Sequence, residues 1–315
     1  MTQPSEHESR GDWLHRDAKY ADPSTRKGHV GLLAAGGSPA SSYRAGRTLP
    51  LRVELVRQLE RRRTQVTFAL VALLPVILWI AFSLTSDEGV GTSVNLVDLA
   101  KGSGTNFAVF ALFATAGFLL VVVVALFFGD TVASEASWSS LRYLLAAPVP
   151  RARLLRQKAI VAGVLSFAAL LLLPVVALLV GTLAYGTGDL VSPTGESLGY
   201  WAATGRALLG GVYVAVNLLW VAGLALLLSV STDAPLGAVG GAVMTSIVSQ
   251  ILDQITALED LRNYLPTHYA NAWSDLLASR IDWGDMTRGA FGSITWAAVL
   301  FALAAWRFHR KDVTS

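Results

Sequence analysis

The sequence predicts an all-α protein that crosses a membrane with six transmembrane helices. Six apolar stretches follow one another along the 315 residues, and the charged residues lie almost entirely between them. At a rise of about 1.5 Å per residue, about 20 helical residues cross a hydrocarbon core of about 30 Å. The predicted spans are Val66–Leu84, Phe107–Phe128, Ile160–Tyr185, Ala207–Val230, Ala234–Ile255 and Phe291–Trp306.

Composition supports this fold class. Hydrophobic residues make up 53% of the chain and charged residues only 15%. A large soluble protein with buried helices would place polar residues at regular helical spacing within each apolar stretch. The six stretches lack such polar residues, so we interpret the chain as a multi-pass membrane protein.

The distribution of Lys and Arg predicts the orientation in the membrane. Basic residues cluster before the first span, between the second and third spans and after the sixth, and they are sparse in the other connections. Cytoplasmic loops carry an excess of Lys and Arg. We therefore expect a protein of the cell membrane with both termini in the cytoplasm. The net charge of +3 reflects this bias, so no nucleic-acid partner is expected.

Three regions are predicted along the chain. Residues 1–48 mix charged residues with Gly, Ser and Pro, which is typical of a disordered cytoplasmic tail. Residues 49–65 form an amphipathic interfacial helix that leads into the first span, with its arginines near anionic headgroups. This helix is either a simple anchor or an elbow that seats a partner protein. Residues 66–311 form the six-span transmembrane domain.

The connection between the second and third spans contains a further predicted helix on the cytoplasmic side. Trp138, Leu141 and Leu145 recur at spacings of three and four residues, so they share one helical face. Pro148 ends this helix, because the residue before a proline avoids the helical conformation. The pattern predicts a compact helix presented to the cytoplasm on a rigid corner.

This connection resembles the first cytoplasmic loop in the membrane subunits of ABC-2-type ATP-binding-cassette (ABC) exporters. Ser139 and Ser140 stand where the family pattern has Gly-Thr, so the glycine's backbone freedom is missing here. The segment before the first span and the short turn at 231–233 extend the resemblance to about residues 50–310. The positions that match the family pattern are Glu135, Leu141, Arg142, Leu144, Leu145, Pro148, Arg151 and Lys158.

The resemblance implies a permease subunit of an ATP-driven exporter. These residues, with Trp138, would form the coupling helix that contacts a cytoplasmic ABC ATPase, and a second membrane subunit would complete a homodimer or heterodimer. The chain has no G-x-x-x-x-G-K-[ST] motif for binding ATP phosphates. We therefore expect that it is not an enzyme and holds no cofactor. ATP and Mg would be bound by the partner subunit. Its apolar spans favour a hydrophobic or amphiphilic cargo such as a drug, antimicrobial peptide, lipid or glycan.

Two further groups of residues are candidates for sites in the membrane domain. Trp273, Leu276 and Leu277 recur at helical spacing between the fifth and sixth spans and resemble the re-entrant-like outer helices of these exporters, which would make them an outer gate. For two members of the second group the sequence favours another role over substrate contact: for Asn217 a helix-to-helix hydrogen bond, and for Asp253 a helix-end position facing water outside. The candidates for the substrate path are Asn217, Trp220, Gln250, Asp253 and Gln254.

Two other function classes fit the sequence less well. A membrane-embedded enzyme would need a catalytic constellation, and the chain has no cysteine, no H-E-x-x-H and no G-x-S-x-G motif. An ion-coupled secondary transporter or channel would place ionisable residues near mid-membrane, where each costs about 2.5–3.5 kcal/mol on insertion scales. Within the predicted spans, Asp253 alone comes near this description. The sequence therefore favours an ATP-driven transport subunit that contacts membrane lipid.

Overall fold

The computed structural model describes residues 51–84, 96–137, 150–192 and 195–310, and this part of the chain is almost entirely helical. The helices before residue 138 are α1 (Leu51–Leu59), α2 (Arg62–Leu84), α3 (Leu96–Lys101), α4 (Gly104–Ala116) and α5 (Leu119–Ser137). Those after residue 149 are α7 (Arg151–Tyr185), α8 (Tyr200–Asn217), α9 (Leu219–Ser231), α10 (Pro235–Asp253) and α11 (Gly284–Arg310). A short antiparallel pair, β1 (Leu190–Val191) and β2 (Ser197–Leu198), departs from the all-α prediction.

The described helices accommodate the six predicted spans, with the second span broken. Helices α2, α7, α10 and α11, and α8 together with α9, are each long and apolar enough to cross a membrane. Helices α4 and α5 pass the same test only as a pair, and they meet at an angle of 56°. Gly117 and Phe118 separate the two, and glycine has a low helix propensity because its backbone loses more freedom on folding. Helices α8 and α9 are also separated, at Leu218.

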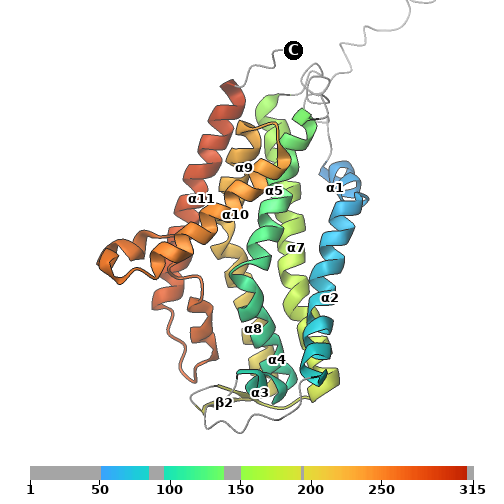
Figure 1. Cartoon of the computed structure of the whole chain (residues 1–315), viewed down its shortest axis with the longest axis vertical. Helices are drawn as coiled ribbons and strands as arrows, with labels where there is room; N and C mark the ends of the chain where they lie inside the picture. Colours follow the sequence, from blue (N-terminus) through green and yellow to red (C-terminus); the bar gives the residue numbers. More distant parts are fainter. Residues whose placement is uncertain (1–50, 85–95, 138–149, 193–194, 311–315) are drawn as a thin grey trace, which may run out of the picture. The chain divides into compact units, whose positions relative to one another are not determined.

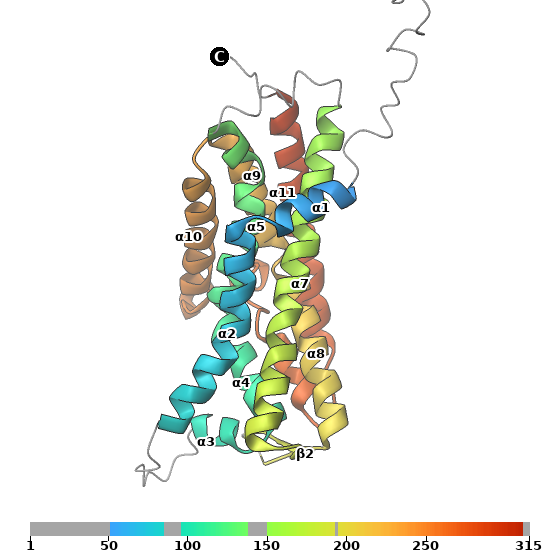
Figure 2. The ribbon, with the colours of Figure 1, turned by 90° about the vertical axis from the view of Figure 1, so that its right-hand side faces the viewer.

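The two ends of the helical bundle differ in composition. Figure 1 shows α1, the start of α7 and the end of α11 at one end, and α3 with the β1–β2 pair at the other. We call the first the basic end, because Arg57, Arg61, Arg151 and Arg310 all lie there. Helix α1 crosses the face of α7 and does not continue the axis of α2 (Figure 2). This crossing brings polar residues of α1 against α7.

Glycine allows two spans to pack with their backbones in contact. Helices α4 and α7 pack side by side, and Gly104 of α4 faces Gly181 of α7. A Cβ atom on Gly104 would lie 2.5 Å from the backbone nitrogen of Thr182, which no real Cβ tolerates. Such close approach of small residues is a usual source of helix association in membranes. By contrast, apolar side chains of α2 and α10 point outward, including Leu70 at 56% and Leu236 at 83% exposure.

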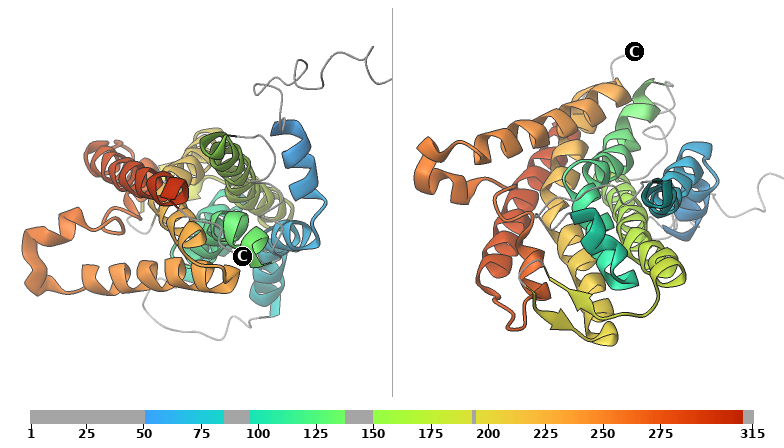
Figure 3. Two further views of the ribbon diagram at one scale, coloured as in Figure 1. Left: turned by 90° about the horizontal axis from the view of Figure 1, so that it is seen from above. Right: turned by 60° about the horizontal axis from the view of Figure 1, so that its bottom comes forward.

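The connection from α10 to α11 contains 3₁₀ helices where the sequence spacing predicts short helices. They are η4 (Thr256–Tyr264) and η5 (Ala272–Leu277). Figure 3 shows α10 leaning away from the other spans and the segment after it projecting from the bundle. Helix η5 ends before Arg280, which is exposed, so Arg280 does not continue the face formed by Trp273 and Leu276.

Replacing Gly104 by Ala should destabilise the subunit. The added methyl group must displace the α7 backbone, and overpacking of this kind costs about 1–3 kcal/mol. The matched control is Gly205→Ala in α8, because a Cβ there meets nothing within 4 Å. Thermal unfolding of the two purified variants should show a lower midpoint for Gly104→Ala only. Equal midpoints would contradict the close α4–α7 contact.

Candidate functional site

A network of four charges, three of them buried, joins α1, α5 and α7 at the basic end. Its members, which we call the charge network, are Glu54 and Arg57 of α1, Glu135 of α5 and Lys158 of α7. Glu54, Glu135 and Lys158 are only 3%, 6% and 4% exposed. The amino group of Lys158 lies 2.5 Å from Oε1 of Glu135 and 3.7 Å from Oε1 of Glu54. The guanidinium of Arg57 lies 2.8 Å from Glu54 and 3.3 Å from Glu135.

Charge balance is what permits this burial. Two carboxylates face two cations, so the formal charges cancel. An unpaired ion loses several kcal/mol of solvation when buried, whereas paired ions recover much of this cost from mutual attraction. Burial alone raises the pKa of Glu54, but the charge of Lys158 and hydrogen bonds from Arg57 and Gln58 outweigh it and hold that pKa below its ordinary value. Glu54 is therefore ionised at neutral pH.

A second acid of α5 pairs with the arginines around the start of α2. Asp130 lies 3.7 Å from Nη1 of Arg61 and also pairs with Arg63. The arginines before the first span were expected to lie near lipid headgroups. Arg57, Arg61 and Arg63 also pair with acids of the protein. Glu54 is the buried residue of α1, while Val56 is 46% exposed. The side chain of Glu54 thus points into the protein.

Only part of the predicted coupling helix falls within the described residues. Glu135 and Lys158 form the shortest contact of the charge network, and Arg151 donates a hydrogen bond of 3.3 Å to the carbonyl of His309 in α11. The roles of Glu54 and Arg57 were missed from the sequence. A signal for them existed, because Glu54 and Arg57 are three residues apart opposite the apolar arc of α1. The predicted coupling residues that lie outside the described residues are Trp138, Leu141, Arg142, Leu144, Leu145 and Pro148.

The structure brings all five candidate path residues to one polar cavity. This cavity, which we call the central cavity, has a volume of about 130 Å³. It reaches the break between α4 and α5 at Gly117 and the break between α8 and α9 at Leu218. Both breaks lie near the middle of their spans, so the cavity lies about halfway along these helix pairs. The path candidates that line it are Asn217, Trp220, Gln250, Asp253 and Gln254.

A polar side chain of the central cavity bonds to the free carbonyl at the α4–α5 break, and the indole N–H of Trp220 has no partner among the described residues. The amide Nε2 of Gln250 donates to the carbonyl of Gly117 at 2.9 Å, which supplies a partner at the point where the α4–α5 ladder is interrupted. Oδ1 of Asp253 lies 2.5 Å from Nδ1 of His268. Trp220 is 3% exposed, and its indole N–H has no hydrogen-bond partner among the described residues. Lining of this kind suits water or a polar group of a ligand.

The two alternatives left open for Asn217 and Asp253 can now be judged from their contacts. Nδ2 of Asn217 donates to Oγ of Ser293 in α11 at 3.0 Å, so Asn217 makes the helix-to-helix hydrogen bond and also lines the cavity. Asp253 is the last residue of α10, as expected. Its carboxylate pairs with His268 beside the cavity, so it is not simply a helix end in open water.

The predicted outer gate packs into the bundle. Trp273 and Leu276 are fully buried, and the Trp273 ring lies 4.3 Å from the ring of Phe113 in α4. Nη1 of Arg206 in α8 donates to the carbonyls of Leu276 at 3.0 Å and Ala278 at 2.7 Å, which fastens η5 to α8. Leu277 is half-buried and lines a second, larger cavity.

Comparison with known proteins gives one match over most of the chain. Residues 58–313 match the family described as ABC-2 family transporter protein. No curated protein matches the sequence significantly. The match covers α2 to α11 and therefore includes Glu135, Lys158 and the central cavity. It begins inside α1, so residues 51–57 of that helix lie before it.

Replacing Lys158 by Met should destabilise the subunit strongly. The change leaves the carboxylate of Glu135 buried with Arg57 alone, and breaking a buried pair from one side costs about 3–5 kcal/mol. The double variant Lys158→Met, Glu135→Gln should recover part of this loss in thermal unfolding. Arg288→Met is the matched control, because the Arg288–Asp285 pair is exposed and such pairs contribute about 0–1 kcal/mol. Equal decreases in the unfolding midpoint for Lys158→Met and Arg288→Met would show that the charge network does not stabilise the fold.

Proposed function

The chain belongs to the ABC-2 family of transporter proteins, and we propose that within this family it is the membrane subunit of an exporter for hydrophobic or amphiphilic molecules. Membership makes it a transport subunit with several membrane-spanning helices and associates it with an ABC ATPase subunit. The direction of transport and the class of cargo are our proposal. Energy comes from ATP hydrolysis in the separate cytoplasmic subunit.

The observation that carries the coupling part of this proposal is the buried charge network. Glu135 and Lys158 stand on either side of the segment 138–149, and their ion pair ties the end of α5 to the start of α7. The ion pair therefore joins α5 and α7 close to the two ends of their connection. A displacement of that segment by an ATPase reaches α5 and α7 together, and it reaches α1 through Glu54 and Arg57.

The coupling segment itself joins these helices to the partner. In our proposal Trp138, Leu141 and Leu145 form its apolar contact face, with Arg142 beside them. Buried apolar anchors flanked by charge commonly dominate protein interfaces.

The central cavity is the part of the substrate path that we assign to this subunit. It lies where two spans are broken, and irregular backbone at membrane depth is tolerated where it is buried in protein or lines a cavity. Trp220 and Gln250 line it together with the Asp253–His268 pair. Trp273 and Leu276, packed between α4 and α8, separate the cavity from the far end of the bundle and act as the outer gate.

The complex contains a second membrane subunit and membrane lipid. The apolar faces of α2 and α10 are exposed in the single chain, as shown by Ile77 at 53% and Met244 at 59%. Contiguous apolar surface of this kind marks contact with lipid or with another protein. We assign these faces to lipid and to the partner membrane subunit.

An ion-coupled transporter is the second candidate, and one observation favours it. Asp253 and His268 form an ionisable pair beside a cavity halfway along two spans. Ionisable residues at such depth commonly mark proton or ion pathways. Transport by reconstituted vesicles decides between the two: export should require ATP and a hydrolysis-competent partner. Uptake or export driven by a pH gradient without ATP would support the second candidate.

Cysteine labelling tests the proposed orientation. The chain has no cysteine of its own, so Ser315→Cys and Leu261→Cys each introduce one reactive thiol. Leu261 is 66% exposed in η4, on the side that we assign to the outside. An impermeant maleimide should label Leu261→Cys on intact cells and Ser315→Cys only after permeabilisation. The reverse pattern would overturn the orientation.

Replacing Leu141 by Asp should separate the subunit from its ATPase. The variant would bury an unpaired carboxylate in the proposed contact, and truncation of a central interface anchor commonly costs about 2 kcal/mol or more. Co-elution with the partner ATPase, and substrate-stimulated hydrolysis, should both fall at least tenfold. Leu261→Asp is the matched control, because it places the same carboxylate at an exposed leucine far along the chain. If Leu141→Asp keeps both properties, the coupling assignment is wrong.

A further inference from the structure

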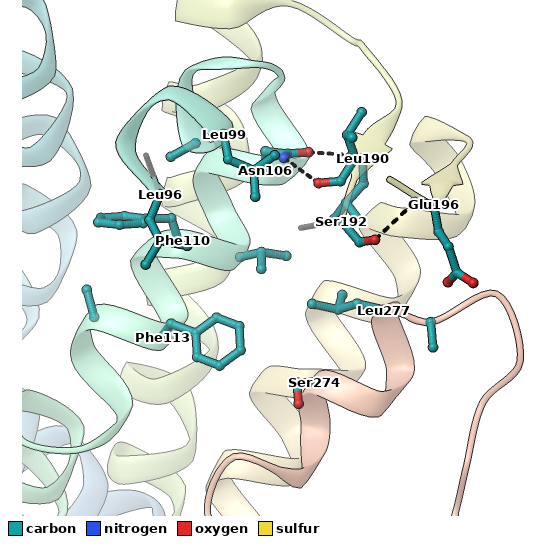
Figure 4. Close-up of a pocket in the computed structure, with 15 residues that line it drawn as sticks. Leu96, Leu99, Asn106, Phe110, Phe113, Leu190, Ser192, Glu196, Ser274 and Leu277 are labelled. Atoms are coloured by element: carbon teal, nitrogen blue, oxygen red, sulfur yellow. Dashed lines mark hydrogen bonds between the residues drawn. The ribbon is translucent and has the colours of Figure 1, made fainter. Parts of the chain in front are cut away.

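A large, mostly apolar cavity lies near the end of the bundle opposite the basic end. We call it the outer cavity, and its volume is about 650 Å³. Its walls come from α3, α4, strand β1 and the 3₁₀ helix η5 (Figure 4). The side chains that face one another across it include Leu96, Leu99, Phe110, Phe113, Leu190 and Leu277. A volume in this range suits a small-molecule ligand.

Polar contacts fix each wall while the lining stays apolar. Nδ2 of Asn106 donates to the carbonyl of Val191 at 2.9 Å, and the N–H of Val191 donates to Oδ1 of Asn106 at 2.9 Å, so strand β1 is bound to α4. The carboxylate of Glu196 accepts hydrogen bonds from the backbone N–H and the hydroxyl of Ser279 at 2.8 and 3.0 Å. Arg206 holds η5 from the α8 side. These hydrogen bonds fix the positions of β1, of Ser279 and of η5 around the cavity.

These contacts also use the polar groups nearest the cavity. The side-chain amide of Asn106 is bonded to β1, and both carboxylate oxygens of Glu196 accept hydrogen bonds from Ser279. The hydrogen bonds of Ser279 lower the pKa of Glu196, so this rim residue is ionised at neutral pH. What remains facing the interior is mostly hydrocarbon and aromatic surface, with Ser192 and Ser274 as the serines of the lining. A ligand inside therefore needs mainly apolar atoms.

The cavity opens to the surroundings of α4. Leu96 and Phe113 line it and are still 62% and 42% exposed. In a membrane protein, the apolar groups most abundant around such an opening are the hydrocarbon chains of lipids and other amphiphiles.

We propose that the outer cavity binds one hydrocarbon chain of an amphiphile, with the polar head outside the cavity near Glu196 and Ser192. An empty apolar cavity forfeits dispersion contacts along its whole lining, and an inserted chain restores them. The chain comes either from a membrane phospholipid or from a single-chain amphiphile that is the cargo. The binding site itself does not require ATP-driven export; only the assignment of the chain to a cargo rests on the proposed function.

Photolabelling of the purified subunit tests this site directly. The subunit in dimyristoylphosphatidylcholine nanodiscs is irradiated with a lysophosphatidylcholine whose palmitoyl chain carries a terminal diazirine, and labelled peptides are identified by mass spectrometry. We expect label on the α4 peptide with Phe110 and Phe113 and on the β1 peptide, relative to label on the lipid-facing α2. Ala114→Trp fills the cavity from α4 and Ala278→Trp fills it from the segment after η5, and each should lower this ratio at least fivefold.

Ala168→Trp is the matched control, because Ala168 is exposed on the spanning helix α7 and does not line the cavity. It should leave the ratio unchanged. Thermal unfolding identifies any variant that fails to fold, and the two filling variants come from different walls, so one folded variant is sufficient. A ratio unaffected by a folded filling variant would overturn the proposal.

Competition separates the two sources of the chain. Displacement of the label by unlabelled lysophosphatidylcholine supports a free single-chain amphiphile, and a phospholipid that co-purifies with the wild-type subunit but not with Ala114→Trp supports a membrane lipid. Neither readout uses the ATPase or nucleotide. A negative result here therefore leaves the exporter proposal standing, and loss of ATP-driven transport leaves the chain-binding site standing.

Discussion

The buried ion pair between Glu135 and Lys158 is the constraint on which the basic end of this protein depends. Neither charge is tolerable alone at such burial, so α5 and α7 must meet at these residues. Glu54 adds a second carboxylate and Arg57 a second cation, which requires α1 to turn away from the axis of α2 and cross α7. One electrostatic requirement thereby fixes the mutual position of three helices.

Charge burial of this kind favours rigid-body movement over local adjustment. Sliding α5 past α7 would separate Glu135 from Lys158 inside the protein, at a cost of several kcal/mol. Moving α1, α5 and α7 together preserves every pair of the charge network. The arrangement therefore suits a region that must pass a displacement from a cytoplasmic partner into the spans without absorbing it.

Broken spans make the middle of the bundle different from its ends. The α4–α5 and α8–α9 breaks lie beside one another, and Gln250 of α10 supplies a hydrogen bond to the freed carbonyl at Gly117. Beyond the breaks, Trp273 fills the space over Gly210, where a Cβ would lie 2.9 Å from the indole ring. On the side of the apolar outer cavity, the buried Trp273 packs against Phe113, which is part of the lining of that cavity.

The sequence by itself determined the spans, because the length of an apolar stretch is a local property and a membrane demands about 20 such residues. The family resemblance pointed to Glu135 and Lys158 as residues that contact an ATPase and did not predict that they pair with each other. The sequence also singled out the five path candidates that line the central cavity. The resemblance to the transporter family followed from a short local motif as well.

Only the tertiary structure decided what these residues contact. Glu54 and Lys158 are far apart in the chain, and the periodicity of α1 fits a helix facing headgroups as well as one facing a buried lysine. The Asp253–His268 pair and the walls of the outer cavity likewise depend on where α10 ends and how η5 docks on α8. Local sequence fixes how long a helix is and which face is apolar, whereas pairing between distant charges depends on packing that no local pattern encodes.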